Sequence, residues 1–144
     1  MGVALSPGTI PSSGKPNFTI PDDEIEIGMG IHGEPGIERT KLMEADELTD
    51  RLMDKLISES DIDSNDEVAV LINGLGSTTL MELMIVNRRV AHYLESKGIN
   101  VYDADINSYC TTMEMAGFSI TLMKLDEELK EYYDAPASSP YYKK

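Results

Sequence analysis

The residues best suited to take part in a reaction lie in the stretch EIEIGMGIHGEPGIER, residues 24–39. Apolar side chains alternate there with a second set, which is Glu24, Glu26, Gly28, Gly30 and His32. Strict alternation predicts a half-buried β-strand over residues 24–32. Glycines weaken a strand interior and offer no side chain to pack, so their positions predict open space beside the His32 imidazole.

An imidazole at the end of a strand could serve as a nucleophile, a general base or a metal ligand. A surface histidine that follows a glycine-rich bulge would explain the same residues, and the spacing leaves both interpretations open. We expect no metal site, because Glu26 and Glu34 give no HxH or HExxH spacing and the other histidine, His92, is distant. Pro35 and Gly36 suit the central positions of a type II turn.

A second glycine-containing stretch, INGLGSTTLMEL, runs from residue 72 to 83. It is not a phosphate loop, because no lysine follows the glycines and the GxGxxG spacing is absent. We interpret it as a tight connection from strand to helix that needs Gly74 and Gly76 for their backbone angles. Cys110 has no basic neighbour to lower its pKa, so we interpret it as a small buried hydrophobic residue.

Length and charge limit the classes of function. The chain has 144 residues, a net charge of -14 and an isoelectric point near 4.3. One domain is expected at this length. Strong acidity argues against binding to nucleic acid or to an anionic membrane surface. The sequence has no apolar run long enough to cross a membrane, and a single cysteine suits a reducing compartment.

The elements that must position these residues follow from periodicity. Strands are expected at GVALS, FTI, 24–32, 67–72, 99–110 and 118–126, and helices at 44–59, 79–97 and 126–133. Thr79 and Glu82 form a capping box for the second helix, which ends before Gly98. The strand–helix–strand order around it predicts a βαβ unit. The fold class is therefore α/β (α+β), with helices covering a mixed sheet.

Four stretches together resemble a known family. They are GVALSPGTIPSSGKPNFTI, EIEIGMGIHGEPGIER, VLINGLGSTTLMEL and YCTTMEMAGFSITLMKLDEELKEYYDAP. In this order they resemble the dihydroxyacetone kinase family, specifically the C-terminal half of the dihydroxyacetone-binding subunit. The resemblance covers nearly the whole chain. It implies a two-layer domain with a mixed sheet of about six strands.

The resemblance also implies a role for the histidine. In that family the histidine of GIHGEPG binds dihydroxyacetone covalently as a hemiaminal, and His32 stands at that position. The resemblance makes His32 the catalytic residue, and His32, Gly28, Gly30, Gly33 and Glu34 the residues that bind substrate. The physics agrees, since a neutral imidazole has a lone pair that can add to a ketone.

Other parts of the active site are expected outside residues 1–144. The family's binding subunit has a preceding α/β domain, so this chain is expected to be an excised C-terminal substrate-binding domain that is inactive alone. ATP or ADP with Mg is expected in a partner helical subunit or fused domain, and no cofactor in this domain. The protein is further expected to be a cytoplasmic homodimer that takes part in glycerol metabolism and has no nucleic-acid or membrane partners.

Two alternatives accompany this interpretation. A non-catalytic paralogue could keep His32 and act as a dihydroxyacetone sensor or coregulator that contacts a transcription regulator. A generic α/β domain of the fatty-acid-binding type is the third interpretation, and the GIHGEPG motif argues against it. The phosphoryl donor also stays open, because ATP and a phosphoprotein relay are both compatible with the resemblance.

Overall fold

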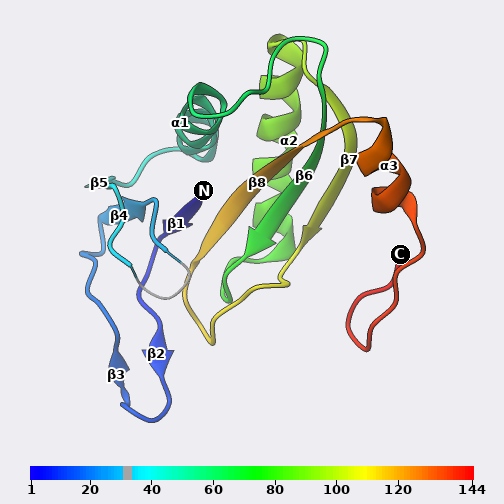
Figure 1. The fold of residues 1–144 in the computed structure, drawn as a ribbon. Coiled ribbons are helices and arrows are strands. Elements are labelled where there is room, and N and C mark those ends of the chain that lie inside the picture. Colours follow the sequence, from blue (N-terminus) through cyan, green and yellow to red (C-terminus); the bar gives the residue numbers. More distant parts are fainter. Residues whose placement is uncertain (31–33) are drawn as a thin grey trace.

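The computed structural model describes residues 1–30 and 34–144. Its elements, in chain order, are β1 Gly2–Ala4, β2 Thr9–Ile10, β3 Lys15–Pro16, β4 Glu24–Ile27, β5 Glu38–Lys41, α1 Ala45–Ser58, β6 Glu67–Gly74, α2 Leu80–Ser96, β7 Asn100–Asn107, β8 Gly117–Leu125 and α3 Glu127–Asp134. Six strands form one sheet in the order β5-β4-β1-β8-β6-β7 (Figure 1). The predicted α/β class and six-stranded mixed sheet are confirmed.

The βαβ unit that the sequence predicts is present. β6 pairs with β7 in parallel and α2 connects the two strands. The other pairings in this sheet are antiparallel. The Thr79 side chain accepts a hydrogen bond from the Glu82 N–H, and the Glu82 carboxylate accepts one from the Thr79 N–H, so the predicted capping box is confirmed. Gly98 follows the helix with a φ of 70°, as expected of a C′ glycine.

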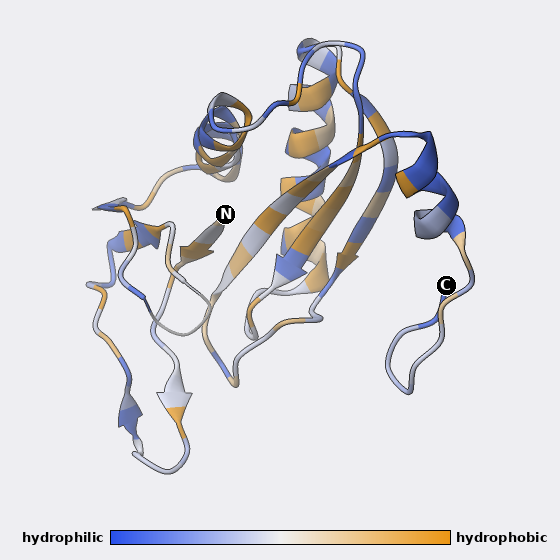
Figure 2. Cartoon of the chain, viewed as in Figure 1, coloured by the Kyte–Doolittle hydropathy of each residue, from blue (hydrophilic) through white to orange (hydrophobic). Residues whose placement is uncertain are grey.

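Helices α1 and α2 cover one face of the sheet, and Figure 1 shows α2 crossing behind β6 and β8. The core between these layers is aliphatic, and its residues without measurable exposure include Ile25, Leu52, Val68, Ile72, Leu94 and Ile120. Figure 2 shows the hydrophobic residues concentrated in β6, β8 and α2, whereas α3 is mostly hydrophilic. The two helices are joined by ion pairs, of which Arg89 with Asp50 is bidentate at 2.7 and 2.5 Å. None of the described helices is long and apolar enough to cross a bilayer.

Three expectations about the N-terminal third are wrong. The strand expected over 24–32 ends at Ile27, because Gly28 has a φ of 80° that ends the extended backbone. Residues 18–20 form no strand, and the sixth strand of the sheet is β5, whose sequence ERTK has no apolar alternation. Gly36 lacks the positive φ that a type II turn requires at this position.

The prediction that Gly74 and Gly76 are needed for their backbone angles is confirmed for Gly76 and wrong for Gly74. Gly76 has a φ of 147°, which is accessible to glycine and strained for other residues. Gly74 instead remains in β6 and has no positive φ. A Cβ atom on Gly74 would lie 2.6 Å from Ser108 Oγ, so close packing and not a special backbone angle favours glycine there.

Candidate functional site

The GIHGEPG segment spans residues 30–36, and the structure describes its two ends. Ile31, His32 and Gly33 lie outside the described residues, so the predicted placement of His32 on the face of Gly28 and Gly30 stays a prediction. On either side, Gly30 N–H donates to the Glu34 carbonyl at 3.1 Å, and Ile37 N–H donates to the Ile27 carbonyl at 2.8 Å. These bonds hold the two ends of the segment close together.

Gly28 and Gly30 do not have open space beside them. A Cβ atom on Gly28 would lie 2.8 Å from Ile37 Cγ1, and one on Gly30 would collide with the Glu34 carboxylate. The immediate surroundings of both glycines are therefore filled, whereas room beside the His32 imidazole, which lies outside the described residues, stays a prediction. Gly28 is needed for its positive φ and the approach of Ile37, and Gly30 for the approach of Glu34.

Glu26 links β4 to the end of the GIHGEPG segment and to β5, a role that strand alternation did not reveal. The side chain is 10% exposed, and it bridges β4 to the residues that begin β5. Its Oε1 accepts the Gly36 N–H at 2.7 Å, and its Oε2 accepts from Arg39 Nη2 at 2.8 Å. The Arg39 hydrogen bond, with the Gly36 N–H second, lowers the pKa of the Glu26 carboxyl. The carboxylate thus remains ionised although it is buried.

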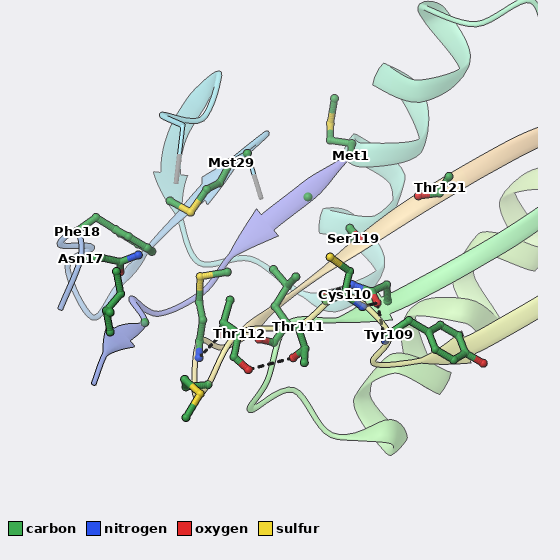
Figure 3. Close-up of a pocket in the computed structure, with 18 of the residues that line it drawn as sticks. Met1, Asn17, Phe18, Met29, Tyr109, Cys110, Thr111, Thr112, Ser119 and Thr121 are labelled. Atoms are coloured by element: carbon green, nitrogen blue, oxygen red, sulfur yellow. Dashed lines mark hydrogen bonds between the residues drawn. The ribbon is translucent and has the colours of Figure 1, made fainter. Parts of the chain in front are cut away.

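A cavity of about 650 Å³ opens on the face of the sheet that α1 and α2 leave uncovered. Leu71 and Asn73 line it from β6, whereas Ile72 between them is buried in the helix-covered core. Ser119 and Thr121 line it from β8 in the same alternating way. Figure 3 shows these two side chains along the strand. This alternation could have been found in the sequence, because the two strands were predicted correctly.

Two further walls close the cavity from the sides. One is formed by Phe18, Met29 and Gly30, and the last of these is the first residue of GIHGEPG. The other is the loop of residues 109–115, which we call the Tyr109–Met115 wall (Figure 3). Cys110 lies in this wall and is exposed, so its prediction as a buried residue is wrong. The reason is that β7 ends at Asn107, before the sheet can cover the cysteine.

The cavity offers hydroxyl groups, an amide and apolar side chains. Hydroxyls of Ser119 and Thr121 can donate and accept hydrogen bonds, which suits a small polyhydroxy compound. Among residues 1–30 and 34–144, no group of three His, Cys, Asp or Glu side chains could hold a metal ion. The described part of the site is therefore suited to binding a neutral polar molecule against an apolar background.

Comparison with known proteins finds relatives over nearly the whole chain. Residues 1–141 match the family model described as the Dak1 domain. The chain is 48% identical over 143 residues to the dihydroxyacetone-binding subunit DhaK of PTS-dependent dihydroxyacetone kinase 2 from Listeria innocua, a match that covers 99% of this chain and 43% of that subunit. The corresponding subunit of the PEP-dependent kinase of Escherichia coli K12 is 36% identical, with 97% and 46% covered.

A solved structure shares the fold as well. The dihydroxyacetone kinase operon co-activator Dha-DhaQ superposes with a TM-score of 0.85 at 36% identity, over 94% of this chain and 42% of that one. This chain thus spans less than half the length of these relatives. The family model covers nearly every residue, and the sheet order, the helices and the GIHGEPG segment lie within the matched range. The chain belongs to the Dak1 domain family.

Proposed function

We propose that residues 1–144 are the C-terminal substrate-binding domain of a dihydroxyacetone kinase subunit, and that His32 holds the ketone covalently. The observation that carries this proposal is the cavity on the uncovered sheet face, because Gly30 lines it and begins the GIHGEPG motif. His32 is two residues further along the chain. Gly28, Gly30, Gly33 and Glu34 are proposed to shape the segment around the bound ligand.

The proposed chemistry is a reversible addition. A neutral imidazole nitrogen of His32 attacks the carbonyl carbon, a C–N bond forms, and the carbonyl oxygen takes up a proton to become a hydroxyl group. Non-covalent contacts to a ligand of about six heavy atoms supply ~9 kcal/mol at the ceiling of about 1.5 kcal/mol per atom. A covalent bond adds to that limited affinity. It also discriminates against glycerol, which has similar hydroxyls and no carbonyl.

The rest of the reaction is assigned to parts beyond this chain. The relatives are about twice as long, and their names describe kinases that depend on PTS or PEP. We propose that the remaining part of the subunit activates the hydroxyl that is phosphorylated. The phosphoryl group would come from ATP through a fused domain, or through a phosphoprotein relay with partner subunits. ATP or ADP with Mg would be bound in the partner subunit or fused domain, and the binding subunit would form a homodimer in the cytoplasm.

A second candidate function has one specific observation in its favour. The co-activator of the dihydroxyacetone kinase operon has the same fold, with a TM-score of 0.85. A protein of that kind would bind the ketone as a signal and contact a transcription regulator. Both functions use capture by His32, so the capture experiment tests what they share. Phosphate transfer by the complete protein with its partners then separates the kinase from the sensor.

Mass spectrometry of the complete protein with dihydroxyacetone tests the capture. We expect the ligand's mass on the peptide that contains His32, lost on acidification because a protonated imidazole has no free lone pair. His32→Ala should abolish the adduct, whereas His92→Ala, an exposed change on α2, should retain it. Glycerol should give no adduct with any of these proteins. Equal retention of dihydroxyacetone by the parent and His32→Ala would refute covalent capture at His32.

A further inference from the structure

The Asn73 side chain joins the end of β6 to the Tyr109–Met115 wall. Asn73 is 4% exposed, and its Oδ1 accepts the backbone N–H groups of Tyr109 and Cys110, both at 2.9 Å. Its Nδ2 donates to the Cys110 carbonyl at 2.8 Å. The amide therefore exchanges both kinds of hydrogen bond with Cys110, as a neighbouring strand would. An amide suits this pairing, because it offers an acceptor and a donor on separate atoms, whereas a carboxylate cannot donate.

Thr112 makes a second connection two residues further along the wall. Its Oγ1 donates to the Leu75 carbonyl at 2.6 Å and accepts the Met115 N–H at 3.0 Å. Its backbone N–H donates to the same Leu75 carbonyl at 2.8 Å. Gly76 packs closely against this turn, since a Cβ there would lie 3.2 Å from the Met115 carbonyl oxygen. The INGLG stretch thus anchors the wall through the Asn73 side chain and the Leu75 carbonyl. Close packing explains its glycines, so a bound anion is not needed to explain them.

We propose that Asn73 and Thr112 are positioning residues for the ketose site. The inference rests on the proposed function, and it assigns these two residues the task of holding the wall that lines the same cavity as Gly30. The wall carries Cys110 and Met113 into the cavity lining. If the wall moves, the cavity widens and the ligand loses the contacts that the wall supplies. Adduct formation then weakens although the attacking imidazole is unchanged.

The test compares adduct formation in matched variants of the complete protein. Thr112→Val removes the hydroxyl at nearly constant volume, and we expect about tenfold weaker half-saturation by dihydroxyacetone, the usual effect of losing one or two hydrogen bonds. Thr112→Ser keeps the hydroxyl and should restore affinity to within about twofold. Thr40→Val makes the same change in β5, at the opposite edge of the sheet, and should leave affinity unchanged.

Asn73→Asp provides an independent variant, because its carboxylate cannot donate to the Cys110 carbonyl. Asn100→Asp, at the exposed start of β7, is the matched control. Hydrogen exchange is the second measurement. We expect faster exchange at the Cys110 and Met115 amides in the Asn73 and Thr112 variants, with the β6 amides still protected. Such a result separates a local loosening of the wall from general unfolding.

The outcomes distinguish the two proposals. If the parent protein forms no adduct with dihydroxyacetone, the proposed function is wrong and the positioning role is lost with it. If the parent forms the adduct and Thr112→Val and Asn73→Asp bind as tightly as the parent, the positioning role alone is wrong. Failure of Thr112→Ser to restore binding would also overturn it, since the wall would then depend on the methyl group and not on the hydroxyl.

Discussion

The two faces of the sheet have opposite properties, although the residues that point to each face alternate along the same strands. On β6, Val68, Val70 and Ile72 are at most 2% exposed beneath the helices. Their neighbours Leu71 and Asn73 line the open cavity on the other face. The covered face is filled with branched aliphatic side chains, and the open face carries hydroxyls, an amide and an exposed methionine on β8. Stability is thus concentrated on one face, and the other face is left free to bind a ligand.

The largest effect is expected from the covered face. Leu52 of α1 is fully buried in the core, so Leu52→Ala should lower the free energy of unfolding by about 2–5 kcal/mol, through lost burial and a residual cavity. Met123→Ala on the open face, where the side chain is 40% exposed, should cost clearly less. Urea titration of both variants measures the difference. Equal losses would show that the open face also contributes a packed core.

The next effect is expected at Glu26, where an ionised group is buried. Glu26→Gln removes the charge that accepts from Arg39 and Gly36, and should cost about 2 kcal/mol near neutral pH. The folded-state pKa of Glu26 is lowered, so its contribution is complete above the pKa of an unfolded glutamate, about 4.3. The contribution is lost as the pH falls through the lower folded-state pKa.

Unfolding free energies measured from pH 7 into the acid range should therefore converge for Glu26→Gln and the parent. Glu24→Gln is the matched control, because it lies on the same strand and pairs with the exposed Lys41. We expect it to change the unfolding free energy much less at neutral pH. A gap between Glu26→Gln and the parent that persists unchanged at low pH would contradict the role of the ionised carboxylate.

A smaller effect is expected at the helix cap on the covered side. Thr79→Ala removes the side-chain acceptor of the α2 capping box and should cost about 1 kcal/mol. Thr79→Ser should recover most of that loss, since serine supplies the same acceptor. Thermal unfolding followed by circular dichroism is sufficient to rank the three proteins. If Thr79→Ser unfolds together with Thr79→Ala, the cap hydrogen bond does not stabilise α2.

The smallest effect on stability is expected on the open face itself. Thr121 is exposed, so Thr121→Val should change the free energy of unfolding by less than about 0.5 kcal/mol. The same substitution should weaken dihydroxyacetone capture, because the Thr121 side chain lines the cavity. Urea titration and adduct mass spectrometry on one sample measure both quantities. A large loss of stability would remove the distinction between the two faces.

Local signals in the sequence determined most of the fold. Periodicity predicts a helix over residues 44–59, and α1 runs over Ala45–Ser58. The parallel pair around α2 followed from an apolar run, a capping box and a C′ glycine, all of which act within a few residues. The GIHGEPG motif can likewise be recognised from the sequence alone. Such features depend on neighbours that lie close together along the chain.

Tertiary structure decided the features that depend on distant residues. β5 has no apolar alternation, and it is a strand because β4 offers it an edge to pair with. The partners of Glu26 lie 10 and 13 residues away, and Asn73 binds a wall 36 and 37 residues away. Periodicity shows that a strand has two faces, but which face receives the helices depends on how they pack. That packing left the second face open and exposed Cys110 beside it.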